Sequence, residues 1–195
     1  MVRANSALVT GGAGGIGAAI AAALAADGLR VGVADLDVGA ADRVAAGIGG
    51  CGVALDVTDP ASVDAAVAEV TGRLGPVEVL VNCAGWDELK PFLDTDEAFS
   101  ARVIEVNLSG PIRATRAVLP GMVERGSGRL VHVASDAGRV GSSLESIYSA
   151  AKGGLIAFSK TIAREVARHG VTSNAVCPGP TDTPLLAGIV RASPD

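Results

Sequence analysis

Three side chains in the second half of the chain are suited to handling a proton at a substrate oxygen. Tyr148 is the only tyrosine and precedes Lys152 by four residues, so on a helix the two side chains share one face. An ordinary phenol has a pKa of about 10, and a neighbouring ammonium stabilises the phenolate, so we expect a lowered pKa at Tyr148. Ser135 could donate a hydrogen bond to the same oxygen. The set predicts proton exchange with an alcohol or carbonyl group, although a Tyr-Lys pair alone also occurs on solvated helix faces.

A glycine-rich turn near the start of the chain is suited to binding a phosphate. The sequence TGGAGGIG at 10–17 lies between a short apolar run and an alanine-rich helical segment. In this position backbone N–H groups and the helix dipole both face an anion, which is typical of a dinucleotide pyrophosphate site. The alternative is a tight turn whose small residues only allow close packing.

Asp35 favours the binding interpretation of the glycine turn. It follows the second apolar run, about 18 residues after Gly17, where a carboxylate can accept hydrogen bonds from an adenosine ribose. The same carboxylate would repel a 2′-phosphate, and the next residue, Leu36, is not a cation. The pattern predicts NAD in preference to NADP. The competing interpretation is an ordinary aspartate at the end of a strand.

The elements that would position these groups alternate along the chain. Six short apolar runs predict strands, at 6–10, 30–34, 52–55, 77–81, 129–134 and 171–176. Helical patterns lie at 16–26, 39–46, 60–72, 99–122 and 148–169, with Thr58 or Asp59 as the N-cap of the third. Apolar strands that alternate with helices indicate an α/β fold, a doubly wound, Rossmann-like parallel sheet with helices on both faces. No linker or repeat interrupts the pattern, so we expect a single domain over 1–195.

Composition argues against several other classes of protein. Of the 195 residues 49% are apolar and 19% are charged, which allows a sizeable core, and the net charge of −5 argues against nucleic-acid binding and against an anionic membrane surface. Glycines interrupt the uncharged stretch at 5–26, so neither a signal peptide nor a membrane span is expected. The three cysteines lack a CxxC spacing and the two histidines are far apart, so we expect no disulfide framework, no metal site and a cytoplasmic location.

The order and spacing of the motifs resemble one known family over nearly the whole chain. The matching segments are Thr10-Gly11-x-x-x-Gly15-Ile16-Gly17, Asp35, Asp56-Val57, Asn82-Cys83-Ala84-Gly85, Asn107, Ser135, Tyr148-x-x-x-Lys152 and Pro178-Gly179. Together they resemble the short-chain dehydrogenase/reductase family. The resemblance implies an NAD-dependent oxidoreductase that transfers a hydride between the nicotinamide cofactor and a secondary alcohol or ketone. The rival hypothesis is a non-catalytic or truncated NAD-binding paralogue that acts as a redox-responsive partner.

The resemblance also implies roles for single residues. Tyr148 would be the catalytic acid/base, Lys152 would tune it and hold the nicotinamide ribose, and Ser135 would orient the substrate oxygen. Asn107 would fix a water that relays protons. Besides Tyr148 and Lys152, the cofactor-binding residues would be Gly11, Gly15, Ile16, Gly17, Asp35, Asp56 and Val57 at the adenine, Asn82, Ala84, Gly85, and Pro178, Gly179 and Thr183 at the carboxamide. Two positions depart from the family pattern, because Cys83 stands where a second asparagine is common and Thr181 where isoleucine or valine is common.

A second set of similarities concerns the substrate. Segments at 82–87, 90–92, 119–125, 134–137, 139–143 and 177–183 resemble a subgroup of the family, the acyl-thioester dehydrogenases. This likeness implies a 2- or 3-hydroxyacyl thioester as the alcohol. Candidate substrate residues would flank the pocket and are Trp86, Ser135, Arg139, Ser142 and Glu145. The alternative is that these are packing residues in a subgroup with varied substrates.

The C-terminal end and the two long helices bear on assembly. Chains of the family usually continue well past the point that corresponds to Asp195, so we expect the C-terminal end of the family fold to be missing here. A naturally shorter chain, an omitted tail and a truncated paralogue all agree with this. The family packs subunits through its long helices, which implies a homodimer or homotetramer. Six apolar residues of these helices favour such an interface, namely Val103, Val106, Ile112, Leu155, Phe158 and Ile162. The alternative is that all six pack against the sheet of their own chain.

Overall fold

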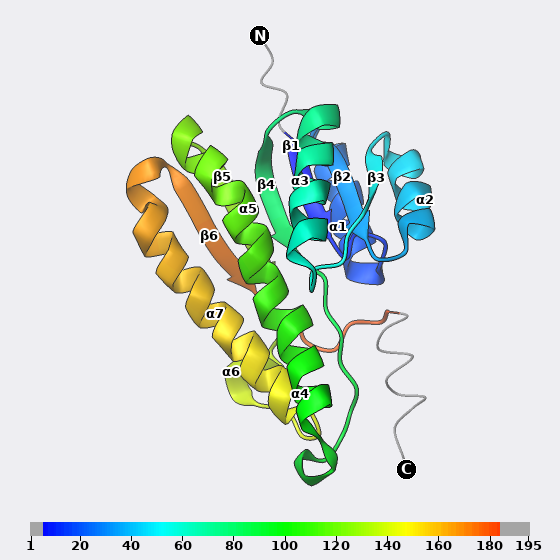
Figure 1. The fold of residues 1–195 in the computed structure, drawn as a ribbon, viewed down its shortest axis with the longest axis vertical. Helices are drawn as coiled ribbons and strands as arrows, with labels where there is room; N and C mark the ends of the chain where they lie inside the picture. The colour runs from blue at the N-terminus through cyan, green and yellow to red at the C-terminus, as the bar shows by residue number, and fades with distance from the viewer. Residues whose placement is uncertain (1–5, 184–195) are drawn as a thin grey trace.

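The computed structural model describes residues 6–183, which form a six-stranded sheet between two layers of helices (Figure 1). The strands are β1 Ser6–Thr10, β2 Arg30–Asp35, β3 Cys51–Ala54, β4 Val77–Asn82, β5 Gly128–Val133 and β6 Val171–Val176. They lie in the order β3-β2-β1-β4-β5-β6, and each neighbouring pair is parallel. The direction of winding therefore reverses between β1 and β4, where open α/β sheets bind ligands. The predicted Rossmann-like sheet of six strands is confirmed.

Helices connect the strands on both faces of the sheet. They are α1 Gly15–Ala26, α2 Val38–Ile48, α3 Pro60–Leu74, α4 Glu97–Ile104, α5 Gly110–Arg125, α6 Ala137–Val140 and α7 Ser146–Val166, with the short turns η1 Phe92–Asp94, η2 Glu105–Ser109 and η3 Ala167–His169. Asp59, not Thr58, is the N-cap of α3, since its carboxylate accepts a hydrogen bond from the Ala61 N–H at 2.9 Å. The turns η1 and α6 lie in segments for which the sequence predicts no helix.

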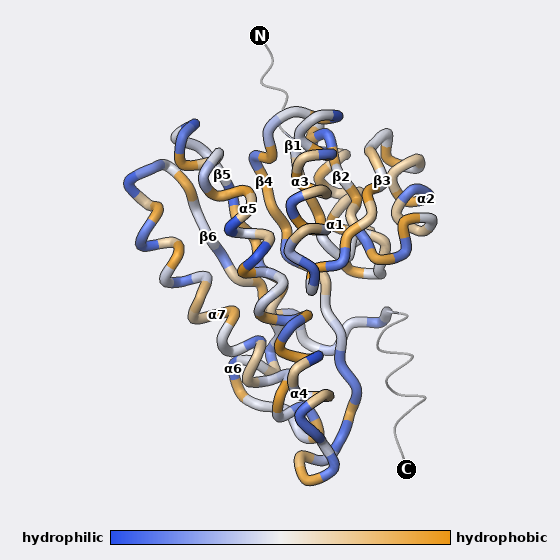
Figure 2. Tube along the Cα trace, viewed as in Figure 1, coloured by the Kyte–Doolittle hydropathy of each residue, from blue (hydrophilic) through white to orange (hydrophobic). Residues whose placement is uncertain are grey.

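Alternation along β1 divides the core into two layers. Leu8 belongs to the cluster that contains residues of α3, α5 and α7, whereas Ala7 and Val9 belong to the cluster that contains residues of α1 and α2. Because successive side chains of a strand point to opposite faces, the two clusters lie on opposite sides of the sheet. Figure 2 shows the outcome, with β4 mostly hydrophobic and α7 alternating between hydrophobic and hydrophilic residues.

The prediction of one uninterrupted helix over 99–122 is wrong. The structure has α4, then the π-helical turn η2, then α5. A π turn holds more residues than an α turn and has no composition of its own, so hydrophobic periodicity does not reveal it. Asn107 lies in η2, where its Nδ2 donates to the Val103 carbonyl at 3.0 Å and to the Trp86 carbonyl at 2.6 Å. The irregular turn therefore joins the helix to the loop that follows β4.

The apolar residues expected at an oligomer interface are largely used inside their own chain. Val103 and Leu155 are fully buried, and Val106 and Ile162 pack against the core cluster of α3 and α5. Ile112 and Phe158 are half-buried. Four of the six residues thus pack within their own chain, in which α5 and α7 lie along one face of the sheet (Figure 1).

Candidate active site

A cavity of about 810 Å³ collects the predicted site residues. Its walls are the glycine turn after β1, the loops after β2, β3, β4 and β5, part of α7 and the segment after β6. The predicted residues that line it are Gly11, Gly15, Ile16, Gly17, Asp35, Asp56, Val57, Ala84, Gly85, Trp86, Ser135, Ser142, Glu145, Tyr148, Lys152, Pro178, Gly179 and Thr183. All these loops follow the carboxyl ends of parallel strands, which meet at one edge of the sheet.

Two predicted asparagines do not line the cavity and instead lie behind its wall. Asn107 holds Trp86 at both backbone groups, since its Nδ2 donates to the Trp86 carbonyl and its Oδ1 accepts from the Trp86 N–H at 3.4 Å. Asn82 is buried at the end of β4, where its Nδ2 lies 3.1 Å from His132 Nδ1 and 3.3 Å from Thr115 Oγ1. Both side chains stabilise the cavity wall from outside it.

Arg139 also stays outside the cavity. It lies in α6, where its guanidinium is exposed and forms an ion pair with Asp136 at 3.0 Å. Ser142 and Glu145, which follow α6, do line the cavity. The turn of α6 therefore directs the cation to solvent and the polar residues after it to the site.

The glycine turn takes a backbone shape that larger residues would not permit. Gly11 has a φ of +64°, and a Cβ there would lie 2.7 Å from the Ala84 Cα. A Cβ on Gly17 would overlap the Gly11 carbonyl oxygen. The Asp35 carboxylate accepts a hydrogen bond from the Ala13 N–H at 3.0 Å, and among residues 6–183 no side chain caps the N-terminus of α1. The helix therefore presents its first N–H groups to the cavity, an arrangement that fits a dinucleotide phosphate.

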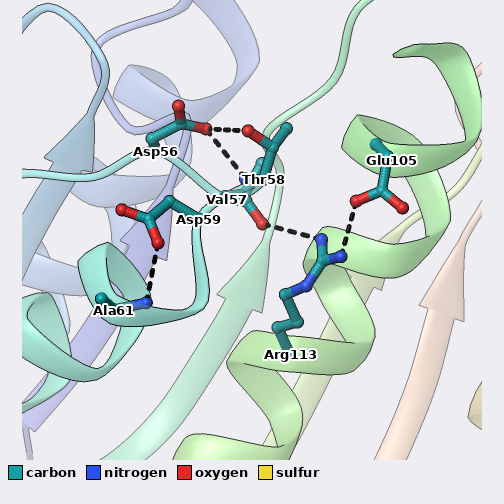
Figure 3. Close-up of polar contacts among 7 residues, drawn as sticks. All are labelled: Asp56, Val57, Thr58, Asp59, Ala61, Glu105 and Arg113. Atoms are coloured by element: carbon teal, nitrogen blue, oxygen red, sulfur yellow. Dashed lines mark hydrogen bonds and ion pairs between the residues drawn. The ribbon is translucent and has the colours of Figure 1, made fainter. Parts of the chain in front are cut away.

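The loop after β3 is fixed by the polar contacts that Figure 3 shows. Asp56 accepts hydrogen bonds from the Thr58 hydroxyl at 2.7 Å and from the Thr58 N–H at 2.8 Å, which hold the pKa of the Asp56 carboxyl below its usual value. Arg113 of α5 donates to the Val57 carbonyl at 3.4 Å and pairs with Glu105 at 2.6 Å. One guanidinium thus joins the loop to α5 and keeps Val57 at the cavity.

Tyr148, Ser135 and Lys152 meet where β5 ends and α7 begins. Tyr148 and Ser135 both line the cavity, and the Ser135 hydroxyl acts on the Tyr148 phenol, whose pKa it lowers. The Lys152 Nζ lies 5.5 Å from the centroid of the Tyr148 ring and donates to the Val133 carbonyl at 2.9 Å. The hydroxyls of Tyr148 and Ser135 can therefore contact one substrate oxygen together.

Burial sets the ionisation of these groups. Burial raises the pKa of Tyr148 to about 12, with a smaller lowering by the Ser135 hydrogen bond and further raising by Asp87 and Glu145. It lowers the pKa of the Lys152 ammonium to about 8. The expectation of a lowered pKa at Tyr148 is therefore wrong for this structure, because burial raises the pKa and the carboxyl groups of Asp87 and Glu145 raise it further. At neutral pH the phenol is protonated, which is the form that can donate to a ketone oxygen.

Asp87 and Arg102 are two of the cavity-lining residues that were not among the predicted site residues. Asp87 is buried on the loop after β4, and Arg102 of α4 places its guanidinium carbon 3.8 Å from the centroid of the Trp86 ring. The signal available for Asp87 is its place just after a strand end, where ligand-binding groups gather. Arg102 had no such signal, because its approach to Trp86 depends on how α4 folds back over the loop.

Two expected absences can be examined only for residues 6–183. In that part of the chain no His, Cys, Asp or Glu residues cluster as a metal site would require. The same residues include no helix with the length and apolar character needed to span a membrane.

The sheet, the glycine turn and the Tyr148 site define an oxidoreductase that uses a nicotinamide cofactor. The family model for short chain dehydrogenase matches residues 5–193. A sorbitol dehydrogenase from Cereibacter sphaeroides is 39% identical over 181 residues, which cover 91% of this chain and 71% of that protein. The chain belongs to the short-chain dehydrogenase family, whose members act on alcohols and ketones.

Two further similarities agree with this assignment. A putative ketoacyl reductase from Streptomyces coelicolor is 41% identical over 190 residues, which cover 94% of this chain and 73% of that protein. The crystal structure of an actinorhodin polyketide ketoreductase variant with NADPH superposes with a TM-score of 0.93 at 38% identity, over 96% of this chain and 75% of that chain. The sequence and the fold thus indicate the same family.

Proposed function

We propose that the protein is an NAD-dependent dehydrogenase that moves a hydride between the cofactor and a secondary alcohol or ketone. The observation that carries this proposal is the meeting of Tyr148, Ser135 and Lys152 in the cavity that the glycine turn also lines. A bound nicotinamide dinucleotide would supply the hydride donor for reduction and the acceptor for oxidation. Tyr148 would give its proton to the ketone oxygen in reduction and recover it in oxidation, while Ser135 holds that oxygen.

Lys152 and Asn107 would support this proton transfer. Lys152 places a buried positive charge near the phenol, and a hydrogen bond to the Val133 carbonyl fixes the ammonium. Its other N–H groups would hold the nicotinamide ribose. Asn107 would fix a water that relays protons, and its hydrogen bonds to Trp86 keep the loop after β4 in place.

For the cofactor we favour NAD over NADP. The Asp35 carboxylate lines the cavity and accepts hydrogen bonds from the Ala13 N–H at 3.0 Å and the Asp37 N–H at 3.2 Å. A ribose hydroxyl can donate to this carboxylate, whereas a 2′-phosphate would meet a like charge. Because the ketoreductase of the solved structure was crystallised with NADPH, the preference rests on Asp35 and not on the family.

The finer hypothesis for the substrate is a 2- or 3-hydroxyacyl thioester, as in 2-hydroxycyclohexanecarboxyl-coenzyme A dehydrogenase. Its support is the sequence resemblance in segments that reach the cavity at Trp86, Ser142 and Glu145. The names of the relatives point to two kinds of substrate, a polyol for the sorbitol dehydrogenase and an acyl group for the ketoacyl reductase. A substrate panel should therefore contain both.

The test is turnover of the nicotinamide, followed by its ultraviolet absorbance, with polyols, cyclic alcohols, hydroxyacyl thioesters and the matching ketones. We expect Tyr148-dependent turnover with NAD and at least one alcohol. A folded protein that binds NAD in a calorimetric titration but turns over no member of the panel would instead support the non-catalytic paralogue.

We also propose a homodimer or homotetramer. Within residues 6–183 β6 lies at one end of the sheet, so its outer edge has no paired strand there, and Ile104 of α4 is 40% exposed. A partner subunit that covers such surfaces would protect unpaired backbone groups from other chains. Sedimentation that shows a folded monomer at micromolar concentration would reject this proposal.

The free thiols of Cys51, Cys83 and Cys177 support the prediction of a cytoplasmic location.

A further inference from the structure

Asp87 is a buried carboxyl group in the cavity to which the proposed hydride transfer assigns no role. It lies on the loop after β4, lines the cavity and is 7% exposed. Its Oδ2 atom is buried and has no hydrogen-bond partner within the described part of the chain. Buried acceptors almost always have a donor, and leaving one unpaired is destabilising. The missing donor therefore indicates a group of a bound molecule.

The backbone brings Asp87 against a second carboxyl group, that of Glu145. The Lys90 N–H donates to the Leu144 carbonyl at 2.9 Å, which joins the loop after β4 to the loop before α7. Leu144 has a φ of 67°, in the left-handed region that a leucine rarely adopts. In this arrangement Asp87 and Glu145 both line the cavity, and the nearby Glu145 carboxyl raises the pKa of Asp87. Two linked loops thus fix the pair.

The two carboxyl groups line the same cavity as the reacting groups Tyr148 and Lys152. Asp87 and Glu145 both act electrostatically on Tyr148, and Asp87 acts on Lys152 as well. Burial is the main cause that raises the pKa of Asp87 to about 7; the Glu88 backbone N–H lowers this pKa, and the nearby Glu145 carboxyl raises it. An acceptor in the same cavity as the phenol can face a substituent of the substrate whose reacting oxygen Tyr148 binds.

We propose that Asp87, paired with Glu145, selects substrates with a hydroxyl group on the carbon next to the reacting carbon. The substrate class is then a vicinal diol, or the corresponding α-hydroxyketone, which rests on the dehydrogenase function proposed above. The neighbouring hydroxyl donates its hydrogen bond to Asp87 Oδ2 while Tyr148 and Ser135 bind the reacting oxygen. A substrate with a carboxylate at that position is excluded, because it brings a second negative charge against a desolvated pair.

One cyclohexanol series tests this selection, with hydrogen, hydroxyl, carboxylate or acyl thioester as the substituent on the carbon next to the alcohol. We expect kcat/KM with NAD to be about 10- to 100-fold higher for the diol than for cyclohexanol, as for a hydrogen bond to a charged group. The carboxylate should be the poorest member. A thioester preferred over the diol would overturn the selection by Asp87 and leave the dehydrogenase function in place.

If no member of the series is turned over, the wider substrate panel still tests the proposed dehydrogenase function, and binding tests Asp87. Calorimetric titrations of the dinucleotide complex should then show tighter binding of the diol than of cyclohexanol. Equal affinities would overturn the role of Asp87 independently of any turnover.

Substitutions at Asp87 test its role in substrate recognition, and a control substitution nearby shows whether the effect is specific. Asp87→Leu removes the acceptor at similar size and should lower the diol-to-cyclohexanol ratio of kcat/KM at least about tenfold. Asp87→Asn removes the charge and should relax the exclusion of the carboxylate by a similar factor. The matched control is Glu88→Gln, because Glu88 is exposed and pairs with Lys90 at 3.5 Å, and it should leave the ratio within about twofold.

Thermal melting would show whether each variant is folded. An unchanged ratio in a folded Asp87→Leu variant would overturn the proposal. If both Asp87 variants fail to fold, the order of kcat/KM values among the substrates of the parent protein tests the proposal.

Discussion

The Lys152 ammonium is anchored to the Val133 carbonyl, at 2.9 Å, and not to the hydroxyl of Tyr148, whose ring centroid lies 5.5 Å away. The cation that the sequence places beside the phenol is therefore positioned by the last residue of β5. Because Lys152 is buried, no solvent competes for this hydrogen bond. Because Lys152 follows Tyr148 by four residues, the two side chains lie on one face of α7. The hydrogen bond to the end of β5 then fixes where the ammonium lies relative to the ring.

Tyr148→Phe should remove nearly all turnover and keep NAD binding. The variant loses only the hydroxyl, and proton transfer by a positioned group contributes about 10²–10⁴-fold to a rate. Steady-state kinetics would give the loss in kcat, and a calorimetric titration would show that the dissociation constant of NAD changes little. Activity within about twofold of the parent would contradict the role of Tyr148.

Asp35→Ser should narrow the preference for NAD over NADP. The substitution removes the charge that would face a 2′-phosphate, so the affinity for NADP should rise by roughly tenfold or more relative to that for NAD. Asp27→Ser is a control of equal charge change, because Asp27 lies after the far end of α1. Equal dissociation constants for both cofactors in the parent protein would show that Asp35 does not contact the ribose.

Arg113→Met should weaken dinucleotide binding without abolishing it. The variant loses the hydrogen bond to the Val57 carbonyl and the ion pair with Glu105, so the loop after β3 is no longer joined to α5. A partly exposed charged contact contributes about 1 kcal/mol, which corresponds to a loss of about fivefold in affinity. Arg116→Met, an exposed position of the same helix, should not change the affinity. Equal losses of dinucleotide affinity in the two variants would contradict this role of Arg113.

His132 should make stability depend on pH. Burial lowers its pKa from 6.5 to about 4, so the stability due to the neutral imidazole is fully present above pH 6.5 and is lost as the pH falls through 4. The loss can reach about 3 kcal/mol. Asp87 acts oppositely over this range, since its raised pKa makes acid stabilise the folded state. The measurement is therefore a comparison with His132→Gln in urea unfolding between pH 7 and pH 4.

The expected difference is that the parent loses more stability than the His132→Gln variant as the pH falls. Parallel curves for the two proteins would show that His132 is protonated as easily in the folded as in the unfolded chain. The starting stability of the variant does not affect this comparison, because only the slope against pH is compared.

The sheet and the glycine turn could be predicted from the sequence because their signals are local. β1 and β6 have the predicted boundaries, since β1 is an apolar run that ends at the glycine turn and β6 lies between Gly170 and the Pro178-Gly179 pair. Apart from Asn82, Asn107 and Arg139, the predicted site residues line one cavity, because they follow strand ends or lie near the start of a helix. Arg139 did not reach it, because α6, a helix of four residues that the sequence does not predict, turns its side chain to Asp136.

What the sequence could not provide is the environment of the site. The pKa of Tyr148 depends on burial and on Asp87 and Glu145, which only the folded loops bring near it. Likewise the unpaired Oδ2 of Asp87 becomes a signal only when the surrounding donors are known. Spacing identifies the reacting groups, and tertiary packing determines their ionisation.

The π-helical turn η2 sets the helical phase of everything that follows it. Each residue of an α-helix advances the chain by about 100°, so removal of one residue from this turn would rotate α5 by that angle relative to α4. Arg113 would then leave Val57, and the buried Ala114, Val118 and Met122 would leave the core. The number of residues in this turn is thus constrained as well as their identity, and a deletion there would detach the cofactor loop and the hydrophobic layer at once.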